Sequence, residues 1–477
     1  MKIQNILYLS LAFNSVGWAQ NSAKEKVIQA VDKQKSEMIE MSDKIWSYAE
    51  VAFEESKSSK LLADYAELQG FTLERAVAGM PTAFIATYGS GKPVVGILGE
   101  FDALPGLSQK AEPEKNPLHE GAAGHGCGHN LFGVGSLAAA VAVKDWMKAN
   151  NIKGTLKFYG TPAEEKYFGK LYFAREGKFN DLDVCLDWHP SDKTESNVQS
   201  SKALVDFIIE FKGQAAHASA DPWNGKSASD GLELFNVGVN YLREHIKPTV
   251  RIHYHMMNAG EVVNVVPDYS KIWVRVRDNS RTGVEEVYKK VLRIAEGACL
   301  MADVSHTVTV VSGLHEVLVN RTGGEALQKN MEMLGPISYT QEETNYAHKI
   351  QEVTGKPQIG INGKVSPLRE TEKEPEGGST DVGDVSYLVP EIRLGVTTAP
   401  EDTPWHSWAV VACGGMSIGH KGMVYAAKAL GMTMVDLFTD ANLVSAIQKE
   451  FKERKADYKY KAILPDGPPP IPAKSGN

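Results

Sequence analysis

Apolar residues recur at helical spacing near the start of the chain. Residues 24–50 are mostly polar, and their apolar side chains lie three or four positions apart: Val27, Ala30, Val31, Met38, Met41 and Ile45. This spacing predicts an amphipathic helix. A similar pattern over residues 57–69 predicts a second helix, which ends at Gly70, a common helix stop.

The pattern then changes to short, β-branched apolar runs that alternate with helical segments. FIATYGS (84–90) and VVGILGE (94–100) predict strands, as do residues 155–160 and 183–188. The segments 131–150 and 167–177 predict helices between them. Strands that alternate with helices indicate an α/β fold with a mixed, largely parallel sheet.

A different order of elements follows the polar segment 190–200. We expect strands at 203–213, 251–260, 269–278 and 305–313, and helices at 227–246 and 283–302. This β-α-β-β-α-β order is that of a ferredoxin-like (α+β) unit. It predicts an inserted domain over 201–313 that divides a catalytic domain into residues 20–200 and 314–464. In the second part we expect helices near 325–334, 341–354 and 418–440 and a strand at 392–398.

The two ends of the chain have their own patterns. Lys2, an apolar run over 6–13, and Gly17 and Ala19 just before Gln20 predict a signal peptide over 1–19. A buried helix or a retained anchor is the alternative. We expect an exported, periplasmic or secreted protein, with no membrane span after cleavage because no later stretch has the ~18 apolar residues required. The Pro-rich residues 465–477 predict a disordered tail.

Composition narrows the possible functions. The 477 residues favour two or more domains. The 51 basic and 59 acidic side chains give a net charge of −8, which argues against nucleic acid as a partner. The four cysteines are far apart in the sequence, so they form no disulfide framework.

Candidate metal ligands fall next to the predicted strand ends. In GHGCGHN (124–130), Cys127 and His129 lie two positions apart, so an extended loop can point both the same way. Ligands gather at the carboxyl ends of parallel strands, and the residues that follow such strands are Asp102, Glu164, Glu165, His189 and His406. Thiolate, imidazole and carboxylate groups bind zinc and related ions. For any single histidine a surface position is the alternative.

The adjacent Glu164 and Glu165 need a separate explanation. Two ionised carboxylates in one cleft repel each other. A metal ion removes this cost for one of them, and the other can take a proton from a metal-bound water. A solvated acidic pair in a loop is the alternative.

Eight motifs occur in one order across residues 44–430: GEFDALP, GHGCGHN, TPAEE, DWHP, GQAAHASADPWNGKSA, NVVPD, GGSTDVGDVS and PWHSWAV. Together they resemble the aminoacylase/carboxypeptidase superfamily of two-metal amidohydrolases. Within it, the chain is most similar to the branch that contains one of the subunits of p-aminobenzoyl-glutamate hydrolase and the related dipeptidases. The resemblance implies a catalytic domain with two divalent ions, Zn or Mn, and a smaller lid domain that dimerises.

The resemblance also implies roles for single residues. The metal ligands would be Cys127, His129, Glu165, His189 and His406. Glu164 would be the general base, and Asp102 would orient a ligand. This chain departs from the wider superfamily at two places. Several relatives have His in the strand before the first ligand turn, where this chain has Glu100/Phe101. They also have Asp at the position of Asn130. The Cys-Gly-His motif belongs to the amidohydrolase branch, which has a different set of metal ligands but still has a complete one.

Further residues concern the substrate. His217, in AAHAS, would reach the neighbouring subunit's active site and stabilise the oxyanion; a surface histidine is the alternative. Asn264 would bind the polar end of the substrate. Gly378, Ser379 and Thr380 would form a loop that binds a carboxylate, with a plain turn as the alternative.

These inferences predict a metal-dependent amidohydrolase that cleaves small N-acyl amino acids or dipeptides, such as p-aminobenzoyl-glutamate. Glu164 would activate the water, and the enzyme would work as a homodimer. Two alternatives remain. One is a dipeptidase or carboxypeptidase on small peptides, and the other is a non-catalytic metal-binding subunit of a hetero-oligomer with a related subunit.

Overall fold

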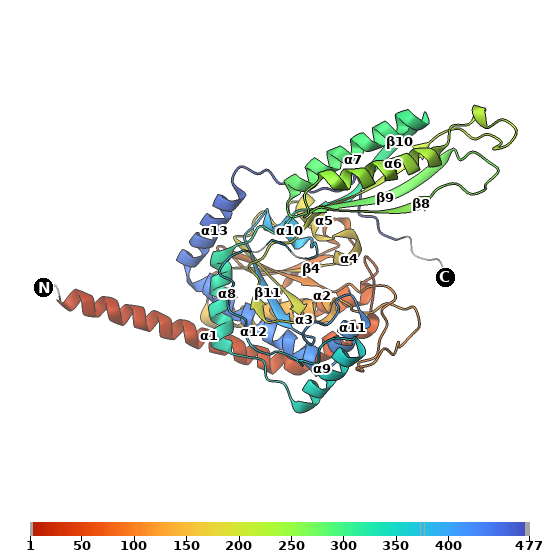
Figure 1. Cartoon of the computed structure of the whole chain (residues 1–477). Coiled ribbons are helices and arrows are strands. Elements are labelled where there is room, and N and C mark those ends of the chain that lie inside the picture. The colour runs from red at the N-terminus through yellow and green to blue at the C-terminus, as the bar shows by residue number, and fades with distance from the viewer. Residues whose placement is uncertain (1–2, 373, 376, 473–477) are drawn as a thin grey trace.

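The computed structural model describes residues 3–372, 374–375 and 377–472. Two units are visible in Figure 1: a large unit around a seven-stranded sheet, and a smaller unit formed by β7–β10 with α6 and α7 on one face. The small unit is inserted between strands β6 and β11 of the large one. This two-sheet α/β architecture confirms the predicted fold class.

The large sheet has parallel strands at its centre and antiparallel strands at its edges. Its order is β1 (Thr72–Arg75), β2 (Phe84–Ser90), β4 (Gly154–Thr161), β3 (Val94–Glu100), β5 (Val184–Ser191), β11 (Glu391–Thr397) and β6 (Glu195–Ser196). The strands β4, β3, β5 and β11 are parallel to their neighbours in this run. Their carboxyl ends therefore meet at one edge, where a ligand site is expected.

Helices cover both faces of this sheet. In β3, Val95 and Ile97 face a core formed with α1 (Ile3–Tyr48), α2 (Ser56–Leu68), α3 (His129–Asn150) and α12 (Ser417–Thr439). Val94 and Leu98 face the opposite core, next to α5 (Lys170–Arg175) and α10 (Val382–Ser386). Burial on both faces explains why this strand is an unbroken apolar run.

The remaining elements of the large unit lie around this frame. They are α4 (Glu164–Tyr167), α8 (Arg321–Leu334), α9 (Gln341–Val353), α11 (Trp408–Gly414), α13 (Ala441–Lys455) and a 3₁₀ turn at Val77–Gly79. No helix in the described part of the chain is long and apolar enough to cross a membrane.

The small unit has the predicted β-α-β-β-α-β order. Its elements are β7 (Ala203–Lys212), α6 (Ala228–Leu242), β8 (Arg251–Asn258), β9 (Tyr269–Asp278), α7 (Arg281–Ala302) and β10 (Ser305–Leu314), with 3₁₀ turns at Pro222–Asn224 and Arg243–His245. All pairings in the order β10-β7-β9-β8 are antiparallel. Phe207, Phe235 and Val291 belong to its separate hydrophobic core.

Three segments differ from the sequence prediction. The helix predicted over 167–177 is shorter in the structure: α5 covers Lys170–Arg175, and Phe168, with a φ of +55°, separates it from the preceding short helix α4. The helix predicted over 24–50 is part of α1, whose backbone also includes residues 3–19 of the expected signal peptide. Residues 465–472 have no regular secondary structure, but Pro469 is buried and the Gly467 carbonyl accepts a hydrogen bond from Arg175.

Candidate metal centre and active site

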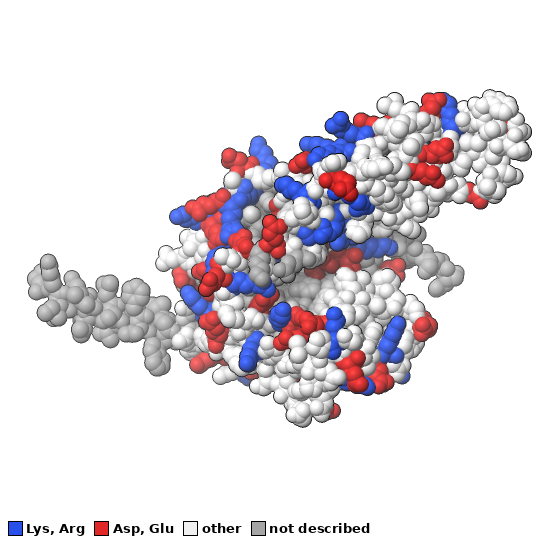
Figure 2. Space-filling model, in the orientation of Figure 1, with Lys and Arg blue, Asp and Glu red and all other residues white. Residues whose placement is uncertain are grey.

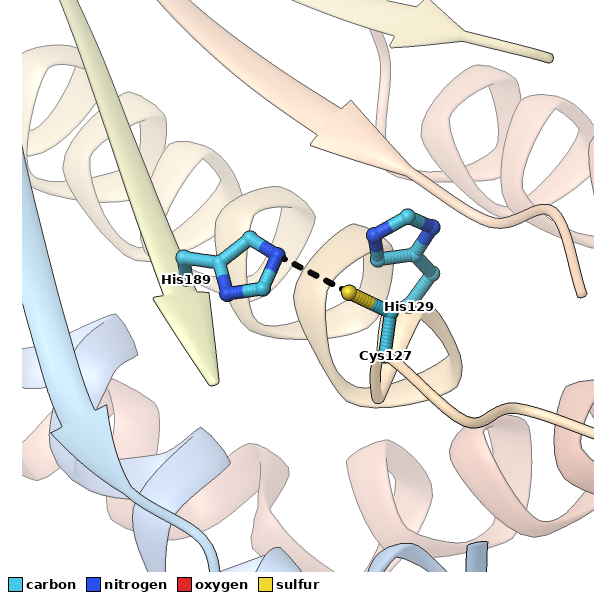
Figure 3. A group of neighbouring side chains, drawn as sticks. All are labelled: Cys127, His129 and His189. Carbon is cyan, nitrogen blue, oxygen red and sulfur yellow. Dashed lines mark hydrogen bonds between the residues drawn. The ribbon is translucent and has the colours of Figure 1, made fainter. Parts of the chain in front are cut away.

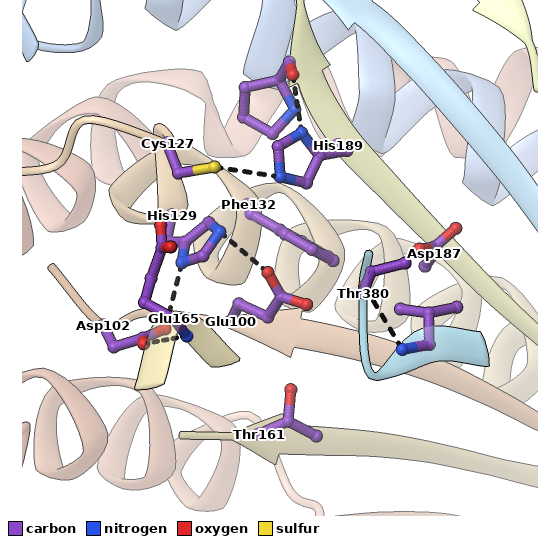
Figure 4. A network of polar contacts seen from close by, with 12 residues as sticks. Glu100, Asp102, Cys127, His129, Phe132, Thr161, Glu165, Asp187, His189 and Thr380 are labelled. Atoms are coloured by element: carbon purple, nitrogen blue, oxygen red, sulfur yellow. Dashed lines mark hydrogen bonds and ion pairs between the residues drawn. The ribbon is translucent and has the colours of Figure 1, made fainter. Parts of the chain in front are cut away.

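The candidate ligands come from four separate segments that meet at the carboxyl edge of the large sheet. Cys127 lies in the loop before α3, and His129 begins that helix. Glu164 and Glu165 begin α4, just after β4, His189 lies near the end of β5, and His406 lies between β11 and α11. Figure 4 shows Cys127, His129 and His189 turned toward one another, with Glu165 beside His129. The parallel strands bring them together although they span hundreds of residues.

The thiol of Cys127 lies at the centre of the arrangement. Its Sγ is 3.4 Å from Nε2 of His189 (Figure 3). Cys127, His129 and His189 form one group whose candidate ligand atoms all lie within 4.8 Å of one another, and Cys127, Glu165 and His406 form a second. Thiolate, imidazole and carboxylate are the groups that bind zinc and related divalent ions, so each of these two groups of residues could hold one such ion.

The protonation geometry of these groups fits metal binding. Nδ1 of His189 is 2.7 Å from the Pro190 carbonyl, so it carries the proton and leaves the lone pair of Nε2 for a ligand bond. Glu165 Oε1 is buried and has no hydrogen-bond partner among the described residues. A buried polar atom without a partner is costly, and a cation beside Glu165 would satisfy it.

Asp102 contacts two of the candidate ligands. Its Oδ1 lies 3.0 Å from Nδ1 of His129, and its Oδ2 accepts a hydrogen bond from the backbone N–H of Glu165 at 3.0 Å (Figure 4). One buried carboxylate therefore orients an imidazole and the helix start that carries the glutamates. Contacts of this kind set ligand geometry in metal sites.

The electrostatics of the site favour a cation. Burial, with Glu100 and Glu165 nearby, raises the pKa of Glu164 well above its usual range. Burial raises the pKa of Glu165 to about 7 and that of the Cys127 thiol as well. Burial and the neighbouring His129 lower the pKa of His189 to about 4. Without a cation these acids are costly to ionise, whereas a divalent ion stabilises the ionised thiol and carboxylates.

Comparison with known sequences identifies the family. Residues 96–387, more than half of the chain, match peptidase family M20/M25/M40. The chain belongs to this family. It is therefore a metal-dependent hydrolase, as the resemblance in its motifs predicted.

Relatives match the M20 chain over nearly its full length. It is 36% identical to a subunit of p-aminobenzoyl-glutamate hydrolase from Escherichia coli (strain K12), with 93% of this chain and 98% of the relative covered. It is 28% identical to the Xaa-Arg dipeptidase of Mus musculus, with 90% and 92% covered. A dinuclear metal-binding M20 peptidase from Bacillus subtilis has the same fold, with a TM-score of 0.56, 18% identity, and 84% and 98% coverage.

A cavity of about 460 Å³ opens over the candidate ligands of the M20 chain. The residues that line it include Cys127, Glu164, Glu165, His189 and His406, and also the predicted loop Gly378, Ser379 and Thr380. Arg275 and Arg277 enter it from β9 of the small unit. Figure 2 shows the surface hollowed between the two units, with acidic and basic side chains at the hollow. The cavity is thus formed by both units.

His217 and Asn264 lie elsewhere. Both are exposed, and the backbone N–H of Ala218 donates to the Asn264 carbonyl at 3.1 Å, so the two predicted residues are neighbours on the small unit. Neither lines the cavity described above. Within one chain the structure does not bring them to the candidate ligands.

Sequence reasoning missed a buried ion cluster beneath the site. Lys170, with a fully buried side chain, lies 2.5 Å from Glu100 Oε1 and 2.6 Å from Asp381 Oδ1. Glu100 Oε2 in turn lies 2.9 Å from Nε2 of His129. Glu100 is the last residue of β3, and this position at the carboxyl edge of the sheet could have indicated that it contributes to the site. Lys170 and Asp381 are 211 residues apart, and no local pattern links them.

Proposed function

We propose that this M20 enzyme hydrolyses the amide bond of small N-acyl amino acids or dipeptides that carry a free carboxylate. The observation that carries this proposal is the pair of three-residue groups that share Cys127 beneath a cavity lined by Glu164. Two divalent ions, Zn or Mn, would be held by Cys127, His129, Glu165, His189 and His406. A thiolate ligand favours zinc. When bound, such ions acidify water and polarise a carbonyl group.

Glu164 is the general base of the proposed reaction. It belongs to neither of the two groups that share Cys127, and it lines the cavity. A carboxylate with a raised pKa is suited to accept a proton from water and pass it to the leaving amine. The neighbouring Glu165 is a ligand, so the adjacent glutamates have separate roles.

Arginines in the cavity support a substrate with a carboxylate. Arg277 lines the cavity, and its buried Nε has no hydrogen-bond partner. Arg275 is neutralised by Asp206, which accepts from both its Nε and an Nη at 2.7 and 2.5 Å. Arg277 therefore has an unused donor, and guanidinium donors bind carboxylates well. The E. coli relative is named for a glutamate amide and the mouse relative for dipeptides. These names suggest which substrates to test: p-aminobenzoyl-glutamate, N-acyl amino acids and dipeptides.

Hydrolysis of that panel by the chain purified alone tests the proposal. We expect turnover of p-aminobenzoyl-glutamate, an N-acyl amino acid or a dipeptide that depends on added zinc or manganese. Preference for dipeptides would favour the dipeptidase alternative. Bound metal without turnover of any substrate would contradict an enzyme active on its own and favour a component of a hetero-oligomer, since the E. coli relative is named as one subunit of its enzyme.

We infer further that two copies of the chain form the active enzyme through the small unit. β8 is an edge strand of its sheet, with unpaired backbone groups on one side. Nearby Met256, Val262 and Val263 are exposed, Val263 to 98%. His217 would then serve the partner's site. Its Nδ1 accepts backbone hydrogen bonds from Ser219 and Ala220, which leaves an Nε2–H free to donate to an oxyanion.

Mixing two inactive variants tests the shared site. We expect Glu164→Gln and His217→Ala each to lose hydrolysis as pure proteins. After subunit exchange at equal amounts, about a quarter of all sites would combine an intact Glu164 with the partner's His217, because half of the dimers are mixed and each has one complete site. Recovery of that activity supports a shared site. No recovery in verified mixed dimers would contradict it.

Export through the predicted signal peptide is also proposed. Cleavage after Ala19 would leave Gln20 as the first residue. The Gln20 side chain donates to Asp436 at 2.6 Å, so the mature chain would begin at a residue that contacts α12. N-terminal sequencing of the protein from a secreting host should give a sequence that begins QNSAK. An intact Met1 in the exported fraction would contradict cleavage.

A further inference from the structure

The turn that carries the proposed base is held in an unusual backbone conformation. Ala163, just before Glu164, has φ of +61°, and Phe168, just after α4, has φ of +55°. Residues with a Cβ rarely adopt such left-handed angles because the side chain crowds the backbone. α4 is only four residues long, so its own hydrogen bonds cannot fix this geometry. Contacts from outside the turn must hold it.

Two carboxyl groups from other segments bond to the backbone of this turn. Asp102 accepts from the N–H of Glu165, as described above. Glu55, 108 residues before the turn, accepts from the N–H of Ala163 at 2.9 Å through Oε1. Its Oε2 accepts from the Thr82 hydroxyl at 3.1 Å. Glu55 is fully buried, so this pair of contacts is shielded from water.

The segment that carries Glu55 also packs on both sides of the site. Phe53 stacks on Tyr167 at the end of α4, with ring centroids 5.1 Å apart. The Glu50 carbonyl accepts from the N–H of Ala103, next to Asp102. Residues 50–55 therefore connect the loop after β3 with the turn after β4. Of these contacts from residues 50–55, only that of Glu55 is a hydrogen bond to Ala163, the left-handed residue just before Glu164.

We propose that Glu55 is a positioning residue: its buried carboxyl holds the backbone of Ala163 and so fixes the turn that presents Glu164 to the cavity. Glu55 is neither among the residues that line the cavity nor in a group of candidate ligands among the described residues, so it acts through the backbone of Ala163. The inference rests on the role proposed above for Glu164. It adds that the position of Glu164 depends on a residue 108 positions before Ala163 in the sequence.

The contact depends on shape more than on charge. Burial, with Asp102 nearby, raises the pKa of Glu55 to about 8, so the carboxyl holds a proton at neutral pH. A glutamine side chain has the same shape as a protonated glutamate. Its oxygen can accept from Ala163, and its amide can donate to the Thr82 hydroxyl. Alanine removes both contacts and leaves a buried N–H without a partner.

Two variants and a matched control test the proposal in the full chain. With the best substrate from the panel, we expect Glu55→Ala to lower kcat roughly 100-fold, with KM changed less than about threefold, because a small misplacement of a catalytic group has an effect of that size. Glu55→Gln should stay within about threefold of the unmodified chain. Glu54→Ala, at an exposed neighbouring position, should have no effect. Metal content should be the same in all of them.

Hydrogen exchange of the folded proteins gives a readout that does not need activity. We expect faster exchange of the amides of residues 163–168 in Glu55→Ala than in Glu54→Ala, and unchanged exchange in Glu55→Gln. Unchanged kcat in Glu55→Ala, or unchanged exchange of this segment, would overturn the proposal, as would an equal loss in Glu55→Gln. If the unmodified chain hydrolyses no substrate, the proposed function fails, and the exchange data still decide whether Glu55 holds the turn.

Discussion

Replacing Glu164 with glutamine should abolish most hydrolysis and leave the metal in place. We expect turnover to fall by about 10³-fold, the usual size of a general-base contribution. The amide has the same shape as the carboxylate but cannot accept the proton from water. The two groups that share Cys127 do not include Glu164, so zinc or manganese content should be unchanged. Steady-state kinetics and elemental analysis of the same sample measure both quantities.

The control for this substitution is Glu176→Gln, which removes an exposed carboxylate shortly after α5. It should keep full activity. Near-normal hydrolysis in Glu164→Gln would show that another group activates the water. Loss of metal together with activity would instead place Glu164 among the ligands, next to Glu100 and His129, with which it forms a further group of candidate donors.

Replacing Cys127 with alanine should affect both candidate metal positions at once, because its sulfur belongs to both groups. We expect the metal content of the purified chain to fall from about two ions to roughly none, since each group would lose one of its three ligands. Hydrolysis should be lost with it. Metal-dependent stabilisation of the fold should also decrease, by about 3 kcal/mol if the ion is present at 100 times its Kd.

Cys299→Ala is the matched control for this experiment. Cys299 also lies beside a histidine, with its Sγ 3.2 Å from Nδ1 of His306 on the small unit. Within the described residues this pair belongs to no group of three candidate ligands. Its removal should change neither metal content nor activity. If Cys127→Ala still bound two ions, the hypothesis that Cys127 is a ligand at both metal positions would be wrong, whatever the activity of the variant.

The sequence by itself determined the fold class and the composition of the candidate site. Periodicity located most strands and helices because buried parallel strands are apolar on both faces and the helices are amphipathic. Glu165, His189 and His406 could be found because they lie at or after the ends of parallel strands, which meet at one edge, and Cys127 because it lies just before a helix at that edge. Cys127, Glu165, His189 and His406 are brought together for that reason. The break at Phe168 was missed because a left-handed residue in an apolar segment has no local pattern.

Only the tertiary structure decided which residues support the site from a distance. The contact of Glu55 with Ala163 and that of Lys170 with Asp381 join positions 108 and 211 residues apart. These buried polar groups are satisfied by specific hydrogen bonds and ion pairs, which depend on the exact placement of the segments after packing. The arrangement of Arg277 over the cavity likewise depends on how the small unit sits on the large one. Sequence periodicity specifies which face of an element is buried, and packing specifies which partner it meets.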